Sequence, residues 1–345
     1  MALVQNYSTV ASRNLIRAEM EMLKMVENIQ VLGMFGDQKQ QPLNKTDTVV
    51  FRRLKPFNSL ANETPNITAA AFITAEGTTP ASNSISYTDV TAVVEQYSVL
   101  FKFSSKSQLM YEDDIPSDMQ KLTAQTLAEV AELVAYGQVK AGTSVIYSNG
   151  STRAGVNTAI SLRKLRQSAR TMESNRAKHV TTTVAAGENF STAPVEAAYL
   201  VFYHTDGSAD VRDLAGFTKR VEYGSAIKPV HPREIGACED FRFIPSPLFK
   251  PYLTAGAGAA NGMVQTGGAC DVYPYIVLAE SACGHINLKG HGYTGISPTV
   301  ISASVKNHAN PSGMFGYVGA DFWYASVRLN ENWMTRIECA VTDLV

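Results

Sequence analysis

The chain has 345 residues, of which 45% are hydrophobic and 18% are charged, a lower charged fraction than in most soluble proteins. Its 30 Lys and Arg residues nearly balance its 31 Asp and Glu residues, and this net charge of −1 argues against a protein whose main task is to grip nucleic acid. No apolar run of about eighteen residues occurs, which argues against a membrane span. The low charge is typical of a protein that hides surface in an assembly, although a large core explains it equally well.

The first predicted element is an amphipathic helix over residues 13–32. Apolar residues recur there at three- and four-residue steps, with charged residues between them. Ser12 is a candidate N-cap for this helix, and Gly33 is a candidate stop. The helix is either a docking arm or an ordinary core helix.

Two strand-like runs follow, at 47–54 and 90–103, and a long segment rich in Thr, Ala, Asn and Pro separates them. Loops of that length inside a compact domain are uncommon and usually functional. A two-stranded arm with a long tip cannot bury its own hydrophobic faces, so it needs a neighbour to lie on. In a chain without a visible catalytic constellation, the simplest neighbour is another copy of the same protein.

A single long helix is predicted over residues 118–141, after a turn-rich segment at 104–116. Ser117 opens a capping box of the form S-x-x-Q, which is typical of a helix start. Gly137 weakens the helix by about 1 kcal/mol without ending it. At about 1.5 Å per residue the rod is roughly 35 Å long, enough for a strut across a flat subunit. Its apolar stripe includes Leu122, Leu127, Val130 and Val134.

A short strand at 143–147 and a second helix at 159–178 come next. One face of this second helix carries Arg163, Arg166 and Arg170. A basic helical stripe of this kind is either a solvated face or a nucleic-acid contact, and the solvated face is the commoner case.

The rest of the chain reads as mixed strands and loops. Buried-strand runs occur at 198–203, 241–244 and 272–278, and a Gly-rich stretch at 252–268 is interpreted as a flexible loop. Mostly apolar and polar residues alternate near the C-terminus, which is typical of a strand and predicts a closing strand there. One side would carry Trp333, Thr335, Ile337, Cys339 and Val341, and the other side would carry Arg336, Glu338 and Thr342.

No sequence motif indicates enzyme chemistry. The chain has no G-x-S-x-G, no H-E-x-x-H and no P-loop. A hydrolase with Cys283 as nucleophile and His285 as base is one alternative, but we expect residues two apart on a strand to face opposite ways, which would place the pair poorly. No catalytic, cofactor-binding or metal-binding residue is therefore predicted.

A zinc site is the other alternative, built from Cys238 and Cys283 with His231 and His285. Structural zinc sites usually show closely spaced cysteine pairs, and none occurs here. Ordinary buried thiols in a reducing cytoplasm are the favoured interpretation.

Seven blocks carry a resemblance to a known family. They are FGDQKQQPLNKTDTVVFRRL at 35–54, ITAEGTTP at 73–80, VTAVVEQYSVLFKFSSK at 90–106, GTSVIYSNGSTRAGV at 142–156, LRKLRQSARTMESNRAK at 162–178, REIGACEDFRFIPSP at 233–247 and DVYPYIVLAESACGHINLKG at 271–290. In this order and spacing they resemble the major capsid proteins of tailed bacteriophages, in particular the N-four-type branch.

The resemblance implies an α+β fold of the Hong-Kong-ninety-seven type. Its parts would be an N-terminal arm at 1–46, an extended hairpin (E-loop) at 47–104, a P-domain at 105–191 around the spine helix 118–141, an A-domain at 192–320, and a closing strand at 321–345. The implied function is structural: hexamers and pentamers form an icosahedral shell around a double-stranded DNA genome. The shell would assemble in the host bacterial cytoplasm and become the virion capsid.

The resemblance also implies partners for the chain. These are other copies of the chain, a portal protein, scaffolding and cement proteins, and packaged DNA held by weak non-specific contact, without a cofactor or a membrane. Arg163, Arg166 and Arg170 are the candidate DNA-facing residues. The E-loop would contact the adjacent subunit through Ile67, Phe72, Ile73, Ile85 and Tyr87.

The E-loop departs from one feature of the family. Some members cross-link neighbouring subunits through an E-loop lysine, whereas here no Lys or Arg occurs from Pro56 to Phe101. We therefore expect a shell held by burial and hydrogen bonding. An encapsulin-like nanocompartment, which shares the fold and encloses enzymes, is the alternative function.

Overall fold

The computed structural model describes residues 31–57, 66–80, 82–111, 114–185, 191–223, 228–258, 262–291, 299–306, 308 and 310–344. The predicted helix at 13–32 lies outside these residues except for its C-terminal end. There the chain forms the 3-10 helix η1 (Leu32–Met34), whose first two residues are buried.

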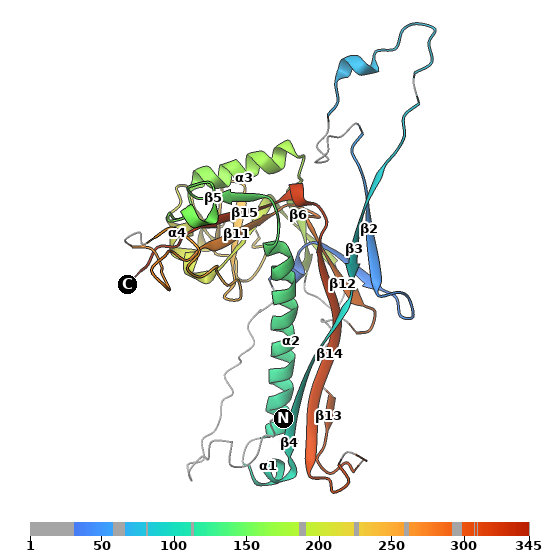
Figure 1. The fold of residues 1–345 in the computed structure, drawn as a ribbon, viewed down its shortest axis with the longest axis vertical. Coiled ribbons are helices and arrows are strands. Elements are labelled where there is room, and N and C mark those ends of the chain that lie inside the picture. Colours follow the sequence, from blue (N-terminus) through green and yellow to red (C-terminus); the bar gives the residue numbers. More distant parts are fainter. Residues whose placement is uncertain are drawn as a thin grey trace.

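The subunit is elongated, and a long helix runs through its middle (Figure 1). This helix, α2, spans Ile115–Lys140 and packs against a five-stranded sheet. Leu127 and Ala131 face Phe322 and Tyr324 of that sheet and form a small core with them. The sheet consists of β1 (Asp37–Gln41), β4 (Glu95–Ser104), β12 (Cys283–Leu288), β13 (Thr299–Ile301) and β14 (Phe315–Arg328).

An eight-stranded sheet forms the thicker end of the body. Its strands are β5 (Val145–Tyr147), β6 (Val180–Ala185), β7 (Ser191–Tyr203), β8 (Thr218–Lys219), β9 (Gly236–Cys238), β10 (Phe241–Pro245), β11 (Tyr273–Leu278) and β15 (Met334–Cys339). Side chains on a strand alternate between faces, so β7 supplies both cores of this sheet. Tyr199, Val201 and Tyr203 join the cluster that includes helix α3 (Leu162–Ser174). Leu200 and Phe202 join the cluster on the other face, next to the end of α2.

A two-stranded arm projects from the body at the end away from β13 (Figure 1). It pairs β2 (Thr48–Leu54) with β3 (Tyr87–Val93) in antiparallel register, from Thr48 opposite Val93 to Leu54 opposite Tyr87. The other helices within the described residues are short. They are α1 (Ser105–Met110), α4 (Ser208–Arg212), and the 3-10 helices η2 (Ala69–Phe72), η3 (Arg153–Gly155), η4 (Thr205–Gly207), η5 (Arg220–Glu222) and η7 (Glu331–Trp333).

The predicted strand run at 90–103 is two strands instead of one. β3 ends at Val93 in the arm, and β4 begins at Glu95 and pairs with β14 over ten residues. Between them Val94 is buried at the root of the arm, where its N–H donates to the carbonyl of Asp47 at 3.0 Å. The chain therefore passes from the arm into the body sheet at this residue.

The long helix starts three residues earlier than predicted. Pro116 lies in its first turn, where a missing N–H costs nothing because the first helical N–H groups have no partner within the helix. Ser117 is consequently inside the helix, so the expected capping box is wrong. The preceding segment, predicted to be turn-rich, contains helix α1, whose N-cap Ser104 accepts a hydrogen bond from the Ser107 N–H at 3.2 Å.

The other predicted elements are confirmed with shifted ends. The helix expected at 159–178 is the shorter α3, and the strands expected at 143–147, 198–203, 241–244 and 272–278 are β5, β7, β10 and β11. The predicted closing strand is β15, which lies between β5 and β11 and is buried along its whole length. The domain boundaries stay a prediction.

Candidate assembly interface

The tip of the arm carries large apolar side chains that the subunit leaves in solvent. The five residues predicted to contact a neighbour are all more than half exposed, at 51% for Ile67, 51% for Phe72, 81% for Ile73, 72% for Ile85 and 55% for Tyr87. Within the tip, the rings of Phe57 and Phe72 lie 5.8 Å apart beside a cavity of about 460 Å³ that is also lined by Ile73 and Pro80. This surface is available to another molecule.

The root of the arm, in contrast, belongs to the subunit core. Phe51 on β2 and Ala92 on β3 pack with Ile286 and Ala325 of the five-stranded sheet. Gly284 leaves room for the Phe51 ring, since a Cβ at that position would lie 3.0 Å from it. The arm is thus anchored at one end and exposed at the other.

A second group of exposed apolar side chains lies toward the opposite end of the subunit, on α1, β4, β13 and the segments beside β13 (Figure 1). We call it the distal patch. It consists of Leu100, Leu109, Met110, Val300, Ile301, Val305 and Met314, which are between 37% and 82% exposed. No local sequence pattern predicts this group, because its members come from three separate segments, at 100–110, 300–305 and 314. The apolar pair Leu109 and Met110, in a segment predicted to be turns, was the only local signal.

The predicted apolar stripe of α2 is only partly buried. Leu127 is fully buried, and Val130 and Val134 pack partly buried beside it, but Leu122 is 47% exposed. At 3.6 residues per turn, positions five apart differ by about 140° around a helix. Leu122 therefore faces away from the sheet that covers Leu127, so the apolar stripe of α2 is not a single buried face.

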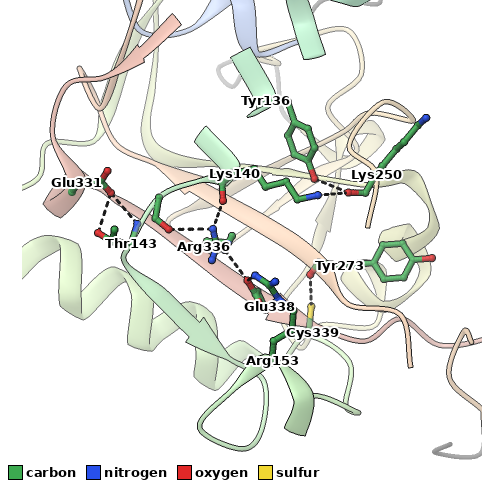
Figure 2. Close-up of polar contacts among 11 residues, drawn as sticks. Tyr136, Lys140, Thr143, Arg153, Lys250, Tyr273, Glu331, Arg336, Glu338 and Cys339 are labelled. Carbon is green, nitrogen blue, oxygen red and sulfur yellow. Dashed lines mark hydrogen bonds and ion pairs between the residues drawn. The ribbon is translucent and has the colours of Figure 1, made fainter. Parts of the chain in front are cut away.

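Buried charges join the end of α2 to the eight-stranded sheet (Figure 2). Glu338 on β15 is fully buried and pairs with two arginines. Arg153 holds it in a bidentate pair, with Nε–Oε2 at 2.7 Å and Nη2–Oε1 at 2.8 Å, and Arg336 Nε lies 2.8 Å from Oε1. Arg336 also donates to the carbonyls of Lys140 and Gly142, which satisfies acceptors that the end of the helix leaves open.

Lys140 completes this junction from the helix side. Its Nζ donates to the carbonyl of Lys250 at 3.0 Å and lies 3.9 Å from the centre of the Tyr252 ring. Burial, together with the nearby positive charges of Arg153 and Arg336, lowers the pKa of the Lys140 ammonium. The junction therefore fixes the direction in which α2 leaves the sheet.

The three predicted DNA-facing arginines are all exposed on α3, but they are not equivalent. Arg166 pairs with Glu239, with Nε–Oε2 at 3.0 Å, and this carboxylate raises the pKa of the Arg166 guanidinium. Part of its charge is thereby compensated within the subunit. Arg163 and Arg170 are the better candidates for contact with an external anion.

Cys283 and His285 lie on the same face of β12, contrary to expectation, because residues two apart on a strand share a face. Cys283 Sγ is 3.9 Å from His285 Nε2. Burial raises the pKa of the Cys283 thiol to about 12 and lowers the pKa of His285 to about 4. Near neutral pH the pair is therefore a thiol beside a neutral imidazole, without the thiolate that nucleophilic catalysis needs.

The zinc alternative is not supported by the positions of its residues. Cys238 lies in the core on one face of the eight-stranded sheet, whereas Cys283 lies in the core on the other face. Among the described residues, Glu173, His179 and Asp240 bring three possible ligand atoms within 4.8 Å of one another, but exposed acidic groups commonly cluster in this way without an ion.

Within the part of the chain that the structure describes, no helix is both long and apolar enough to cross a membrane.

No protein-family model and no curated protein matches the sequence, but solved structures match the fold. The capsid of Ralstonia phage GP4 aligns with a TM-score of 0.63 at 9% identity, covering 97% of this chain and 100% of that chain. The Cyanophage Pam1 capsid asymmetric unit aligns with a TM-score of 0.60 at 11% identity, covering 98% of each chain. The capsid structure of Cyanophage P-SCSP1u aligns with a TM-score of 0.58 at 13% identity, covering 95% of this chain and 94% of that chain.

These similarities extend over nearly the whole chain. The chain therefore has the α+β fold of phage capsid proteins, of the Hong-Kong-ninety-seven type, as the sequence resemblance predicted. At such low identities the similarity concerns the fold alone, and the N-four-type branch stays a prediction.

Proposed function

We propose that this chain is the major capsid protein of a tailed bacteriophage. Copies join as hexamers and pentamers into an icosahedral shell around a double-stranded DNA genome. The observation that carries the proposal is the arm, which is anchored in the core at Phe51 and exposes its apolar tip, in a chain with the phage-capsid fold over nearly its whole length.

The arm would act as an intersubunit clamp that holds neighbouring copies together. Burying its exposed apolar side chains on a neighbour stabilises the contact by roughly 25 cal/mol per Å² of apolar surface removed from water. The distal patch offers a second apolar contact at the other end of the subunit. A closed shell repeats each contact many times, so modest individual contacts add up to a stable particle.

The wall would meet its DNA through weak, non-specific contacts. The chain is close to neutral overall, and Arg163 and Arg170 are the exposed candidates on α3. Few Lys or Arg contacts to phosphate give weak, salt-sensitive binding, which suits a container that has to release its genome. A portal protein, and scaffolding or cement proteins, would complete such a particle.

The proposal is tested with the purified chain by sedimentation and negative-stain microscopy over a range of concentrations. We expect rings of five or six copies, or closed shells. A species that stays at the monomer mass of 37.4 kDa at every concentration contradicts the proposal.

The contents of such particles distinguish a capsid from an enzyme-filled nanocompartment. The matched structures described above come from phage particles, which favours the capsid. We expect nuclease-protected double-stranded DNA in particles from infected cells. A co-purifying cargo enzyme in place of DNA, found by mass spectrometry, would favour the nanocompartment.

A further inference from the structure

The segment at 31–35 is largely buried in the core of the subunit. Val31 and Leu32 are fully buried and Phe35 is nearly so, next to the end of α2 and to β12. The Phe35 ring lies 5.4 Å from that of Phe202.

A single acidic side chain of α2 holds this segment by its backbone. Glu132 is 1% exposed, and its Oε1 accepts a hydrogen bond from the Leu32 N–H at 2.8 Å. Its Oε2 accepts one from the Gly33 N–H at 3.3 Å. Carboxylates are almost never fully buried unless they are paired, so this position needs a physical explanation.

Burial raises the pKa of Glu132 to about 7. The N–H groups of residues 31–33 and the charge of Arg233 lower it, but they do not cancel the effect of burial. The carboxyl of Glu132 therefore changes charge near neutral pH while it remains inside the core.

Other titratable groups also face this segment. Two of them lie on β12. The ring of His285 contacts the carbonyls of Leu32 and Phe35, and burial lowers the pKa of His285 to about 4. The thiol of Cys283 contacts the Phe35 carbonyl. The turn after residue 230 places the ring of His231 6.4 Å from that of Phe35, and it also carries Arg233. Substitution of Glu132 alone leaves all of these groups in place.

We propose that Glu132 is a proton-controlled latch, which holds residues 31–35 in the core when its carboxyl is neutral and loosens them when it is ionised. The ionised form is poorly solvated in the closed state and well solvated once the segment leaves. A neutral carboxyl loses much less hydration free energy when it is buried, so its preference for the open state is weaker.

Proton binding decides whether raising the pH opens or closes the latch. In the open state the Glu132 carboxyl returns to its ordinary pKa of 4.5, whereas in the closed state it is about 7. Between these values the closed state binds more protons, so raising the pH favours opening. Below pH 4.5 and above about pH 7 the latch no longer responds to pH. This property of the subunit does not depend on the proposed function.

The test is hydrogen exchange of the full-length protein, resolved to the Leu32 and Gly33 amides, between pH 5.5 and 8.5. After correction for intrinsic exchange, we expect the protection of both amides to fall by about ten-fold between pH 5.5 and 7 and to level off above about pH 7.5. Glu132→Gln should abolish this dependence. Glu129→Gln, one turn away on the same helix, should keep it.

A flat wild-type profile, or an unchanged profile in Glu132→Gln, contradicts the latch. The amide of Ile286, in the β12–β14 ladder, serves as a reference within the same protein. If its protection falls in parallel with that of Leu32 and Gly33, the pH effect is global and the latch is wrong. This comparison needs only the wild-type protein, so it decides the matter even if Glu132→Gln fails to fold.

Discussion

Arg153 and Glu338, which are 185 positions apart in the sequence, form a bidentate ion pair inside the subunit. Their N–O distances are 2.7 and 2.8 Å, and the Glu338 side chain is fully buried. The pair connects η3 to the last strand, and through Arg336 it reaches the end of α2.

Removing the carboxylate should destabilise the subunit strongly. Glu338→Ala leaves Arg336 with a buried, uncompensated charge and removes the carboxylate partner of the partly exposed Arg153, which costs about 3 kcal/mol or more. Denaturant unfolding of the unassembled protein measures this loss. Asp89→Ala is the control, because its pair with Arg52 is exposed and contributes little. Equal effects of the two substitutions would contradict the assignment of Glu338 as the centre of a buried network.

Two leucines of α2 should respond differently to the same change. Leu127→Ala opens a cavity beside Phe322 and should cost about 2–5 kcal/mol of unfolding free energy. Leu122→Ala, on the exposed side of the helix, should cost less than about 1 kcal/mol. Thermal melting compares the two variants. A loss from Leu122→Ala as large as that from Leu127→Ala would show that both faces of the helix are buried.

The sequence predicted most elements because their patterns are local. The apolar runs of β10 and β11 and the three- and four-residue steps of α2 report their own structure. Helical geometry also predicts that Leu122 and Leu127 face different ways. The division of the 90–103 run at Val94 could not be predicted from the local sequence, because it depends on pairing with β14, which lies more than two hundred residues away.

The candidate interface was predictable only in part. The arm tip stood out because it is long, apolar in places and free of lysine. The distal patch could not be found from sequence, since the fold gathers it from distant segments. The burial of Arg336 and Glu338 could not be predicted from sequence either. The two residues alternate with apolar residues, a pattern that is equally typical of a strand with one solvated face.

The shell should contain no covalent cross-links between subunits. The absence of lysine from Pro56 to Phe101 leaves no E-loop lysine to act as the nucleophile of such a link. Particles boiled in detergent should therefore run near 37.4 kDa, with or without reductant. A ladder of bands at multiples of that mass would contradict this expectation.

The arginines of α3 should differ in their contribution to DNA binding. Replacing both Arg163 and Arg170 with Gln should weaken binding to double-stranded DNA and reduce the slope of log affinity against log salt by about 2. Replacing Arg52 and Arg166, which are both paired with carboxylates, changes the net charge equally but should affect binding less. Fluorescence anisotropy at several salt concentrations measures both. An unchanged affinity and slope in the Arg163 and Arg170 double variant would exclude these two arginines as DNA contacts.

We expect the arm tip to join subunits and to add little to the fold of its own subunit. The β2–β3 ladder allows the tip to be removed cleanly, because Leu54 lies opposite Tyr87 and the Lys55 N–H donates to the Ser86 carbonyl at 3.0 Å. Joining Lys55 to Ser86 through Asn-Gly, which favours a two-residue hairpin turn, replaces residues 56–85. Val221→Ser, at an apolar residue that is 94% exposed outside the arm, is the control.

Sedimentation of the shortened protein beside the wild type is the most direct measurement, with circular dichroism and thermal melting as checks of the fold. We predict that the shortened chain keeps its spectrum and melting temperature but no longer forms stable shells, while Val221→Ser assembles normally. Normal assembly of the shortened chain would contradict the role of the arm as the intersubunit clamp, and its unfolding would show that the tip belongs to the core.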